Sequence, residues 1–133
     1  VLMYMLDTNT CIYIIKRRPV DVLKRFEAVD NDQICISVVT HAELQYGVVR
    51  SSKIEHNQRI LDAFVARLTV WAWGQDAVAH YGRIRRHLEQ KGTPIGNMDL
   101  LIAAHALAKS CTLVTNNQRE FERVPELETA NWI

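Results

Sequence analysis

The chain lacks long hydrophobic runs, and no stretch approaches the roughly 20 consecutive apolar residues that a membrane span requires. Its beginning also lacks a basic segment followed by an apolar stretch and a cleavage site. We therefore expect no membrane association and a cytoplasmic location. Cysteine is scarce, and none of Cys11, Cys35 and Cys111 belongs to a C-x-x-C pair. Their wide spacing beside apolar residues predicts reduced thiols in the core.

Glycine and proline are also few. The five glycines and three prolines are scattered, and there is no internal repeat, low-complexity tract or linker. Because the chain has 133 residues, of which 48% are hydrophobic, we expect residues 1–133 to form a single domain around one core. The net charge is only +1, so no global field favours a nucleic acid or a membrane surface. A polyanion would have to bind to local basic patches.

Short apolar runs alternate with longer segments of helical spacing. The runs at 3–6, 34–37, 68–73 and 113–115 have the length of strands and are bounded by polar or turn residues. After a first helix near Thr8 or Asn9, the spacing predicts helices at 19–29, 38–50, 54–68, 75–90, 97–109 and 119–124, with a loop at 92–96. Parallel strands need crossover connections of this kind. The predicted class is therefore α/β, with a parallel sheet covered on its faces.

Oxygen-bearing side chains follow two of the predicted strands. Asp7 ends the first strand, and Asn116 and Asn117 end the last one. In open parallel sheets, ligands bind beyond the carboxyl ends of the strands. Asp7 is also a good cap for the helix that begins near Thr8 or Asn9, and capping and metal binding can coexist.

Two further carboxylates are candidates for the same edge of the sheet. Asp99 opens a helix whose next five residues are all apolar. The helix dipole favours an acid there by about 0.3–1 kcal/mol, but a carboxylate at the start of so buried a helix also suggests a function. Glu43 lies one turn into the helix after the second strand, where it is either solvated or points back toward Asp7.

Three carboxylates at one edge repel one another unless a cation or raised pKa values relieve the repulsion. Oxygen ligands without clustered cysteine or histidine favour Mg²⁺ or Mn²⁺ over zinc and copper. Such an ion activates water and binds phosphate oxygens during attack on a phosphodiester. The residues therefore predict a divalent metal site made by Asp7, Glu43 and Asp99.

Candidates for binding a nucleic acid are less specific. Basic side chains could face phosphates and aromatic side chains could stack on bases, while the alternatives are a solvated helix face and a core position. The basic candidates are Lys16, Arg17, Arg18, Arg83, Arg85, Arg86 and Lys91. The aromatic candidates are Tyr13, Tyr46, Trp71 and Trp73.

The segment from His41 to Glu43 matches the H-x-E signature of zinc nucleoside deaminases. That signature also needs a P-C-x-x-C pair to supply two more zinc ligands, and the chain has none. The deaminase class is therefore excluded. The histidines expected on the surface or as hydrogen-bonded core residues are His41, His56, His80, His87 and His105.

Four segments occur in the same order as the motifs of a known family: "MLDTNTCIYIIK", "ISVVTHAELQYGV", "IGNMDLLIAAHALA" and "LVTNNQREFERVPELETANW". Together they resemble the PIN-domain ribonucleases, specifically the VapC toxins of bacterial type II toxin–antitoxin pairs. The resemblance implies a PIN-domain-like three-layer α/β/α sandwich with a central, mostly parallel sheet. It also implies a Mg²⁺- or Mn²⁺-dependent endoribonuclease that a cognate VapB antitoxin inhibits.

The resemblance places the family's acidic cluster on Asp7, Glu43 and Asp99. A fourth position, often Asp in a T-x-D motif, is Asn117 here, and Glu120 is the candidate for the missing carboxylate. The hypothesis is that Asp7 and Asp99 bind the metal while Glu43 orients or deprotonates the attacking water. The residues expected to tune the surroundings of the metal are Thr8, Thr115 and Asn117.

The resemblance further implies cleavage of a tRNA in its anticodon stem-loop, with initiator tRNA as the first candidate. It implies a homodimer, antitoxin segments laid across the active-site groove, and recruitment to operator DNA through the antitoxin. The predicted helices at 19–29 and 38–68 are candidates for these protein surfaces. Two alternatives stay open: a catalytically weak PIN-fold module that binds RNA or protein, and a phosphoacceptor domain, which usually has paired acids after its first strand.

Overall fold

The computed structural model describes residues 2–133, which form one five-stranded sheet flanked by helices. The strand order is β3-β2-β1-β4-β5, and every neighbouring pair is parallel. The α/β class is confirmed, and the sheet is wholly parallel where a mostly parallel one was expected. The strands are β1 (Tyr4–Leu6), β2 (Ile34–Ser37), β3 (Thr69–Trp71), β4 (Thr112–Val114) and β5 (Thr129–Ala130).

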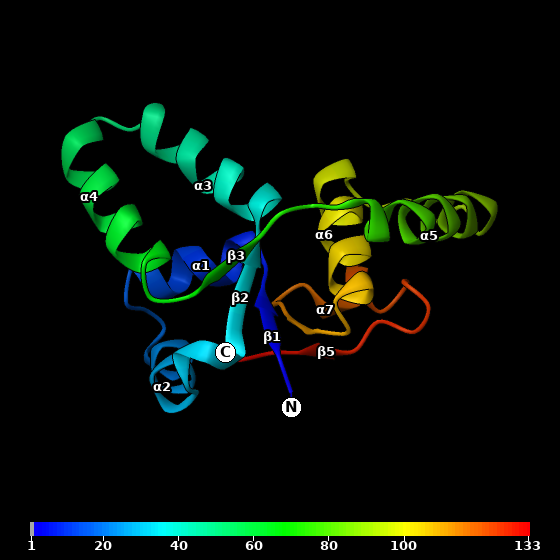
Figure 1. Cartoon of the computed structure of the whole chain (residues 1–133), viewed down its shortest axis with the longest axis horizontal. Coiled ribbons are helices and arrows are strands. Elements are labelled where there is room, and N and C mark those ends of the chain that lie inside the picture. The colour runs from blue at the N-terminus through cyan, green and yellow to red at the C-terminus, as the bar shows by residue number, and fades with distance from the viewer. Residues whose placement is uncertain (1) are drawn as a thin grey trace.

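The helices lie on both faces of the sheet, with α1 to α4 on one side and α5 to α7 on the other (Figure 1). They are α1 (Thr8–Ile15), α2 (Val20–Ala28), α3 (Val38–Val49), α4 (Ile54–Val65), α5 (Val78–Gln90), α6 (Asn97–Ala108) and α7 (Gln118–Phe121). Two 3₁₀ turns, η1 (Asn31–Gln33) and η2 (Gln75–Ala77), precede β2 and α5. The arrangement is the three-layer sandwich that the resemblance implied.

Successive strand residues enter two different cores because side chains alternate across a sheet. Met5 and Leu113 pack against α5 and α6, whereas Leu6 and Val114 pack against α1 to α4. A sheet covered on both faces needs strands that are apolar without interruption, which explains the short hydrophobic runs of the sequence. The three cysteines are buried and free, as predicted.

Most predicted elements agree with the structure to within a few residues. The strand β5 was not predicted, because it has only two half-buried residues and no apolar run. Its position depends on pairing with β4 and on backbone bonds beside it, including the N–H of Thr115, just after β4, which donates to the Ala130 carbonyl at 2.8 Å. The last helix runs over Gln118–Phe121 where 119–124 was expected. Among residues 2–133 we find no helix both long and apolar enough to cross a membrane.

Two helices begin directly after the strands that precede them. Asp7 follows β1 and caps α1, and Ser37 ends β2 and caps α3. Both side chains accept a hydrogen bond from a backbone N–H of the first turn, which replaces a partner that the helix cannot supply. The first turns of α1 and α3 therefore stand at the carboxyl edge of the sheet.

Candidate active site

Asp7 lies at the carboxyl end of the central strand β1 with only 5% of its surface exposed. Its Oδ1 accepts a hydrogen bond of 2.8 Å from the Thr10 N–H. The side chain is therefore the N-cap of α1, which confirms the capping role predicted from the sequence. Within residues 2–133 no hydrogen bond reaches Oδ2. One oxygen therefore fixes the carboxylate while the other stays available for a ligand.

Glu43 lies in the second turn of α3 and is half-buried. Its Oε1 accepts a hydrogen bond of 2.6 Å from Thr8 Oγ1, at the start of α1. This short bond to a charged acceptor joins the helices that leave β1 and β2. It turns Glu43 toward the edge where Asp7 lies, which the sequence had offered as one of two possibilities.

Asp99 lies in the first turn of α6, and the pKa of its carboxyl group is raised to about 7. Burial is the largest cause, and the neighbouring Glu120 is the next. The charges of Asp7 and Glu43 raise this pKa further. Since unit charges influence a pKa at close range, the four carboxylates converge on one region.

Three polar residues after β4 support this region. The buried Thr115 accepts the Asn117 N–H on Oγ1 at 2.9 Å. Asn117 Nδ2 donates to Glu120 Oε2 at 2.6 Å, and the Gly96 N–H donates to Glu120 Oε1 at 3.4 Å. Asn117 thus holds Glu120 beside the start of α6, which brings together the two residues that the sequence had offered for the fourth acidic position.

The donor set fits a hydrated divalent ion better than a closed protein cage. In the part of the chain that the structure describes, no three His, Cys, Asp or Glu side chains form a complete metal-binding group. Mg²⁺ commonly takes one or two carboxylates and keeps several water molecules. A cation beside Asp99 would also offset the repulsion that raises the pKa of this residue. The residues that could hold such an ion are Asp7, Asp99 and Glu43, with Glu120 adjacent.

Replacement of Asp99 by Asn is expected to stabilise the metal-free protein at neutral pH. The pKa of Asp99 is about 7 in the folded chain and lies at its ordinary, lower value in the unfolded chain. The contribution of the Asp99 proton to the free energy of unfolding is therefore complete below pH 4 and is lost as the pH rises through 7. The variant escapes this loss, and at pH 8 it should gain on the order of 1–2 kcal/mol after allowance for solvent screening. Urea unfolding with EDTA at pH 5 and pH 8 checks this result. A gain of equal size at both pH values would contradict the pKa shift.

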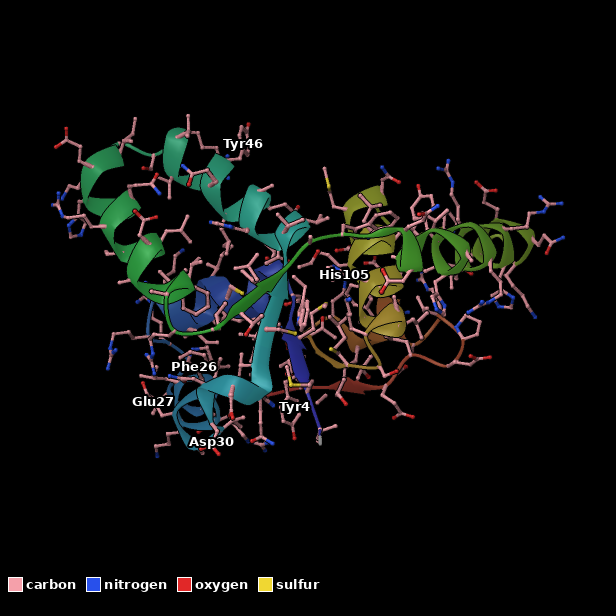
Figure 2. The ribbon with its side chains drawn as sticks, in the orientation of Figure 1. Tyr4, Phe26, Glu27, Asp30, Tyr46 and His105 are labelled. Carbon is pink, nitrogen blue, oxygen red and sulfur yellow. The ribbon has the colours of Figure 1, made fainter. Side chains whose placement is uncertain are left out.

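An apolar groove of about 1190 Å³ opens beside the carboxylates. It begins at Thr8 and Glu43 and continues between α3 and α4, which Figure 1 shows as a helical hairpin extending from the sheet. Reciprocal bonds of 2.7 and 3.0 Å between Gln45 and Gln58 tie the two helices together. Figure 2 shows Tyr46 pointing outward from α3, and 66% of its surface is exposed.

The basic candidates divide into two groups. Lys16 lines the groove, together with Arg50, which the sequence patterns had not singled out. Arg85 instead lies on α5 on the other side of the sheet, where it contacts Tyr81 and Glu89 at 3.0 and 3.3 Å. Of the basic candidates, Lys16 therefore shares a groove with Glu43, whereas Arg85 does not.

The aromatic candidates are also spread over the molecule. Tyr13 and Trp73 pack against the two cores, and Trp71 carries the Lys109 ammonium 4.7 Å from its ring centre. Only Tyr46 among the four lines the groove.

Comparisons with known proteins show the family to which the chain belongs. A family model described as PIN domain matches residues 4–127, and the chain belongs to the PIN-domain family. More narrowly, it groups with the VapC ribonucleases. It is 48% identical over 132 residues to Ribonuclease VapC2 of Rickettsia felis, with 98% of each chain covered. It is 43% identical over 131 residues to the tRNA(fMet)-specific endonuclease VapC of Salmonella typhimurium, again with 98% of each chain covered.

Solved structures give the same result. VapBC2 from Rickettsia felis, bound to a DNA fragment from its promoter, matches with a TM-score of 0.94 and 47% identity over 99% of this chain and 100% of that one. DNA-bound VapBC from Salmonella typhimurium matches with a TM-score of 0.94 and 42% identity over 100% of both chains. The resemblance found in the sequence is confirmed. The chain is an endoribonuclease of this class, and neither the weak binding module nor the phosphoacceptor domain is supported.

Proposed function

We propose that this chain is the toxin of a toxin–antitoxin pair, a single-domain endoribonuclease that needs a divalent ion, Mg²⁺ or in its place Mn²⁺, and cleaves tRNA in the cytoplasm. The observation that carries the proposal is the convergence of Asp7, Glu43, Asp99 and Glu120 at the carboxyl edge of the sheet. Initiator tRNA is the first candidate substrate, because a relative of 43% identity is named a tRNA(fMet)-specific endonuclease. The expected cut lies in the anticodon stem-loop and halts translation.

Asp7 and Asp99 are the residues that would hold the ion. When bound, the ion supplies a Lewis acid that lowers the pKa of a water molecule and neutralises phosphate oxygens. Asp7 is suited to this task because its Oδ1 is fixed by the Thr10 N–H. Asp99 is suited because its proton leaves near neutral pH, where a cation can replace it.

Glu43 is proposed to orient the attacking water and accept its proton. The Thr8 hydroxyl at 2.6 Å holds Glu43 in one orientation and leaves Oε2 for the water. Asn117 fixes Glu120, so this carboxylate adds negative charge beside Asp99, although position 117 lacks the Asp that the resemblance often places there. Thr115 supports Asn117 through the 2.9 Å bond to its N–H.

Thr8→Val is expected to lower kcat about tenfold with little change in KM, because Glu43 loses its orienting bond while RNA binding is preserved. Steady-state kinetics on a tRNA substrate measures both constants. Thr10→Val is the matched control, since its hydroxyl on the same helix donates to the Val114 carbonyl at 3.2 Å and not to Glu43. If both variants lose the same activity, the loss comes from α1 and not from the orientation of Glu43.

The antitoxin is proposed to bind in the groove between α3 and α4, and the toxin to act as a homodimer that reaches operator DNA through the antitoxin. Two related structures are of VapBC bound to DNA, which supports this assembly. A groove lined by exposed apolar side chains is expected to bind the apolar face of a partner segment. A basic side chain of the partner could then pair with the carboxylates at the groove's end.

Digestion of total RNA with the purified protein and Mg²⁺ tests the substrate. We expect one tRNA species to be cut while ribosomal and messenger RNA stay intact. If every tRNA stays intact while another RNA is cut, the tRNA assignment is wrong and the endoribonuclease class stands.

A further inference from the structure

His105 is a buried polar side chain in a helix that is otherwise apolar from Leu100 to Ala108. It has no exposed surface, and Figure 2 shows it on the side of α6 that faces the sheet. Its Nδ1 lies 2.7 Å from Ser37 Oγ. Within residues 2–133 no hydrogen bond of good geometry reaches its Nε2, although a backbone hydrogen bond with Ala72 also acts on the pKa of this side chain. Burial of such a group is costly, so a leucine here would be expected to fold at least as well.

Ser37 is the residue at which β2 ends and α3 begins. It is fully buried, and its Oγ accepts the Val39 N–H at 3.1 Å as the cap of α3. Burial, and next the charge of Lys109, lowers the pKa of His105, so the imidazole is neutral at pH 7. We assign the Ser37 hydroxyl as the donor to Nδ1, because a hydrogen bond from the ring to the Ala72 backbone carbonyl places the ring proton of the neutral imidazole on Nε2.

This bond joins the two segments that carry Glu43 and Asp99. Glu43 lies six residues after Ser37 on α3, and Asp99 lies six residues before His105 on α6. Apart from this bond, α3 and α6 meet through apolar side chains, whose attraction is not directional. Apolar packing alone permits small shifts of one helix along the other, whereas a 2.7 Å hydrogen bond fixes one relative position.

We propose that His105 is a positioning residue: its bond to Ser37 sets the separation of Asp99 from Glu43, two of the three carboxylates that could hold the ion, and so the affinity of the site for that ion. This inference rests on the function proposed above. It assigns a role in the reaction to two buried residues that touch neither the ion nor the RNA.

Three variants separate positioning from general stability. His105→Leu removes the bond and keeps an apolar side chain of similar size. His105→Asn keeps the bond, because the amide oxygen of asparagine can take the place of Nδ1 and accept from the Ser37 hydroxyl. Trp73→Phe is the control, since it removes a different bond to α6, the 2.9 Å bond from Nε1 to the Leu101 carbonyl, which does not involve α3.

Titration of Mn²⁺ into the RNA-free protein, followed by electron paramagnetic resonance, gives a readout besides activity, and kcat and KM on tRNA give a second one. For His105→Leu we expect Mn²⁺ affinity and kcat to fall about tenfold with KM nearly unchanged, as for residues that orient metal ligands. His105→Asn and Trp73→Phe should stay within about twofold of the original protein. Should His105→Leu fail to fold, His105→Met removes the same bond with a more adaptable apolar side chain and leaves the Ser37 cap of α3 in place.

The proposal is overturned if His105→Leu binds Mn²⁺ as the original protein does, or if His105→Asn or Trp73→Phe loses as much affinity as His105→Leu. These results leave the endoribonuclease function intact, because the original protein still binds the ion and cleaves RNA. If the original protein itself neither binds Mn²⁺ nor cleaves RNA, the proposed function fails, and the role of His105 fails with it.

Discussion

Asp7→Asn is expected to lower the rate of RNA cleavage roughly 10³-fold, a loss of about 4 kcal/mol of transition-state stabilisation, and to abolish toxicity. Asp7 is the most buried of the carboxylates at the site, and it lies on the central strand of the sheet. Its replacement removes a negative ligand where the ion would bind and leaves the neighbouring geometry in place. Cleavage of tRNA at saturating Mg²⁺ and growth of cells that express the variant measure the two effects.

The fold should survive this change. Asn is as good a helix cap as Asp, so its side-chain oxygen can still accept the Thr10 N–H. Thermal unfolding followed by circular dichroism checks that the variant is native. Asp21→Asn is the matched control, because it removes the same charge from the first turn of α2 at an exposed position. Retained cleavage by Asp7→Asn, or an equal loss in Asp21→Asn, would contradict the role of Asp7.

Ile60→Glu is expected to weaken binding of the antitoxin about 100-fold, equivalent to about 2.7 kcal/mol, without loss of ribonuclease activity. Ile60 lines the groove from α4, and 38% of its surface is exposed, so a glutamate can be accommodated in the free toxin. In the complex the new carboxylate would be buried against an apolar partner without a counter-charge, which is costly. The variant should therefore remain toxic in cells that also express the antitoxin.

Ile54→Glu provides the control for this experiment. Ile54 lies on the same helix with 48% of its surface exposed, and it does not line the groove. The same substitution there should leave antitoxin affinity within about twofold of the original. Calorimetric titration with purified antitoxin and a growth assay measure both variants. If both variants lose the same affinity for the antitoxin, or if neither variant loses affinity, the antitoxin does not bind in the groove.

The sequence was sufficient for the sheet and most of the helices because a parallel sheet covered on both faces requires short, fully apolar strands. β5 could not be predicted in this way. Thr129 and Ala130 are only half-buried, and the strand exists because β4 offers backbone partners at its edge. A two-residue strand of this kind is determined by its neighbour rather than by its own composition.

The site residues that could be predicted from the sequence are those whose place in a strand or helix is itself unusual for a carboxylate. Asp7 directly follows a strand and Asp99 opens an apolar helix, and both features can be seen in the sequence. The bond from Thr8 to Glu43 spans 35 residues, and the proximity of Glu120 to Asp99 depends on the loop after β4. The roles assigned to these residues remain predictions.

His105 shows where a usable signal was present and was not followed. It was expected on the surface or in the core, and the structure places it in the core with Ser37 as its partner. A single polar residue within nine residues of an otherwise apolar helix marks a buried group that must find a partner. The identity of that partner, 68 residues away, required the tertiary structure.

Sequencing of the 5′ ends of tRNA fragments tests the central claim most directly. The purified protein with Mg²⁺, the same protein with EDTA, and Asp99→Asn with Mg²⁺ are each incubated with total tRNA. We predict a new 5′ end in the anticodon stem-loop of one tRNA in the first reaction, and no such end in the other two. The same fragment in the EDTA reaction, or at full yield with Asp99→Asn, would contradict a metal-dependent site that includes Asp99.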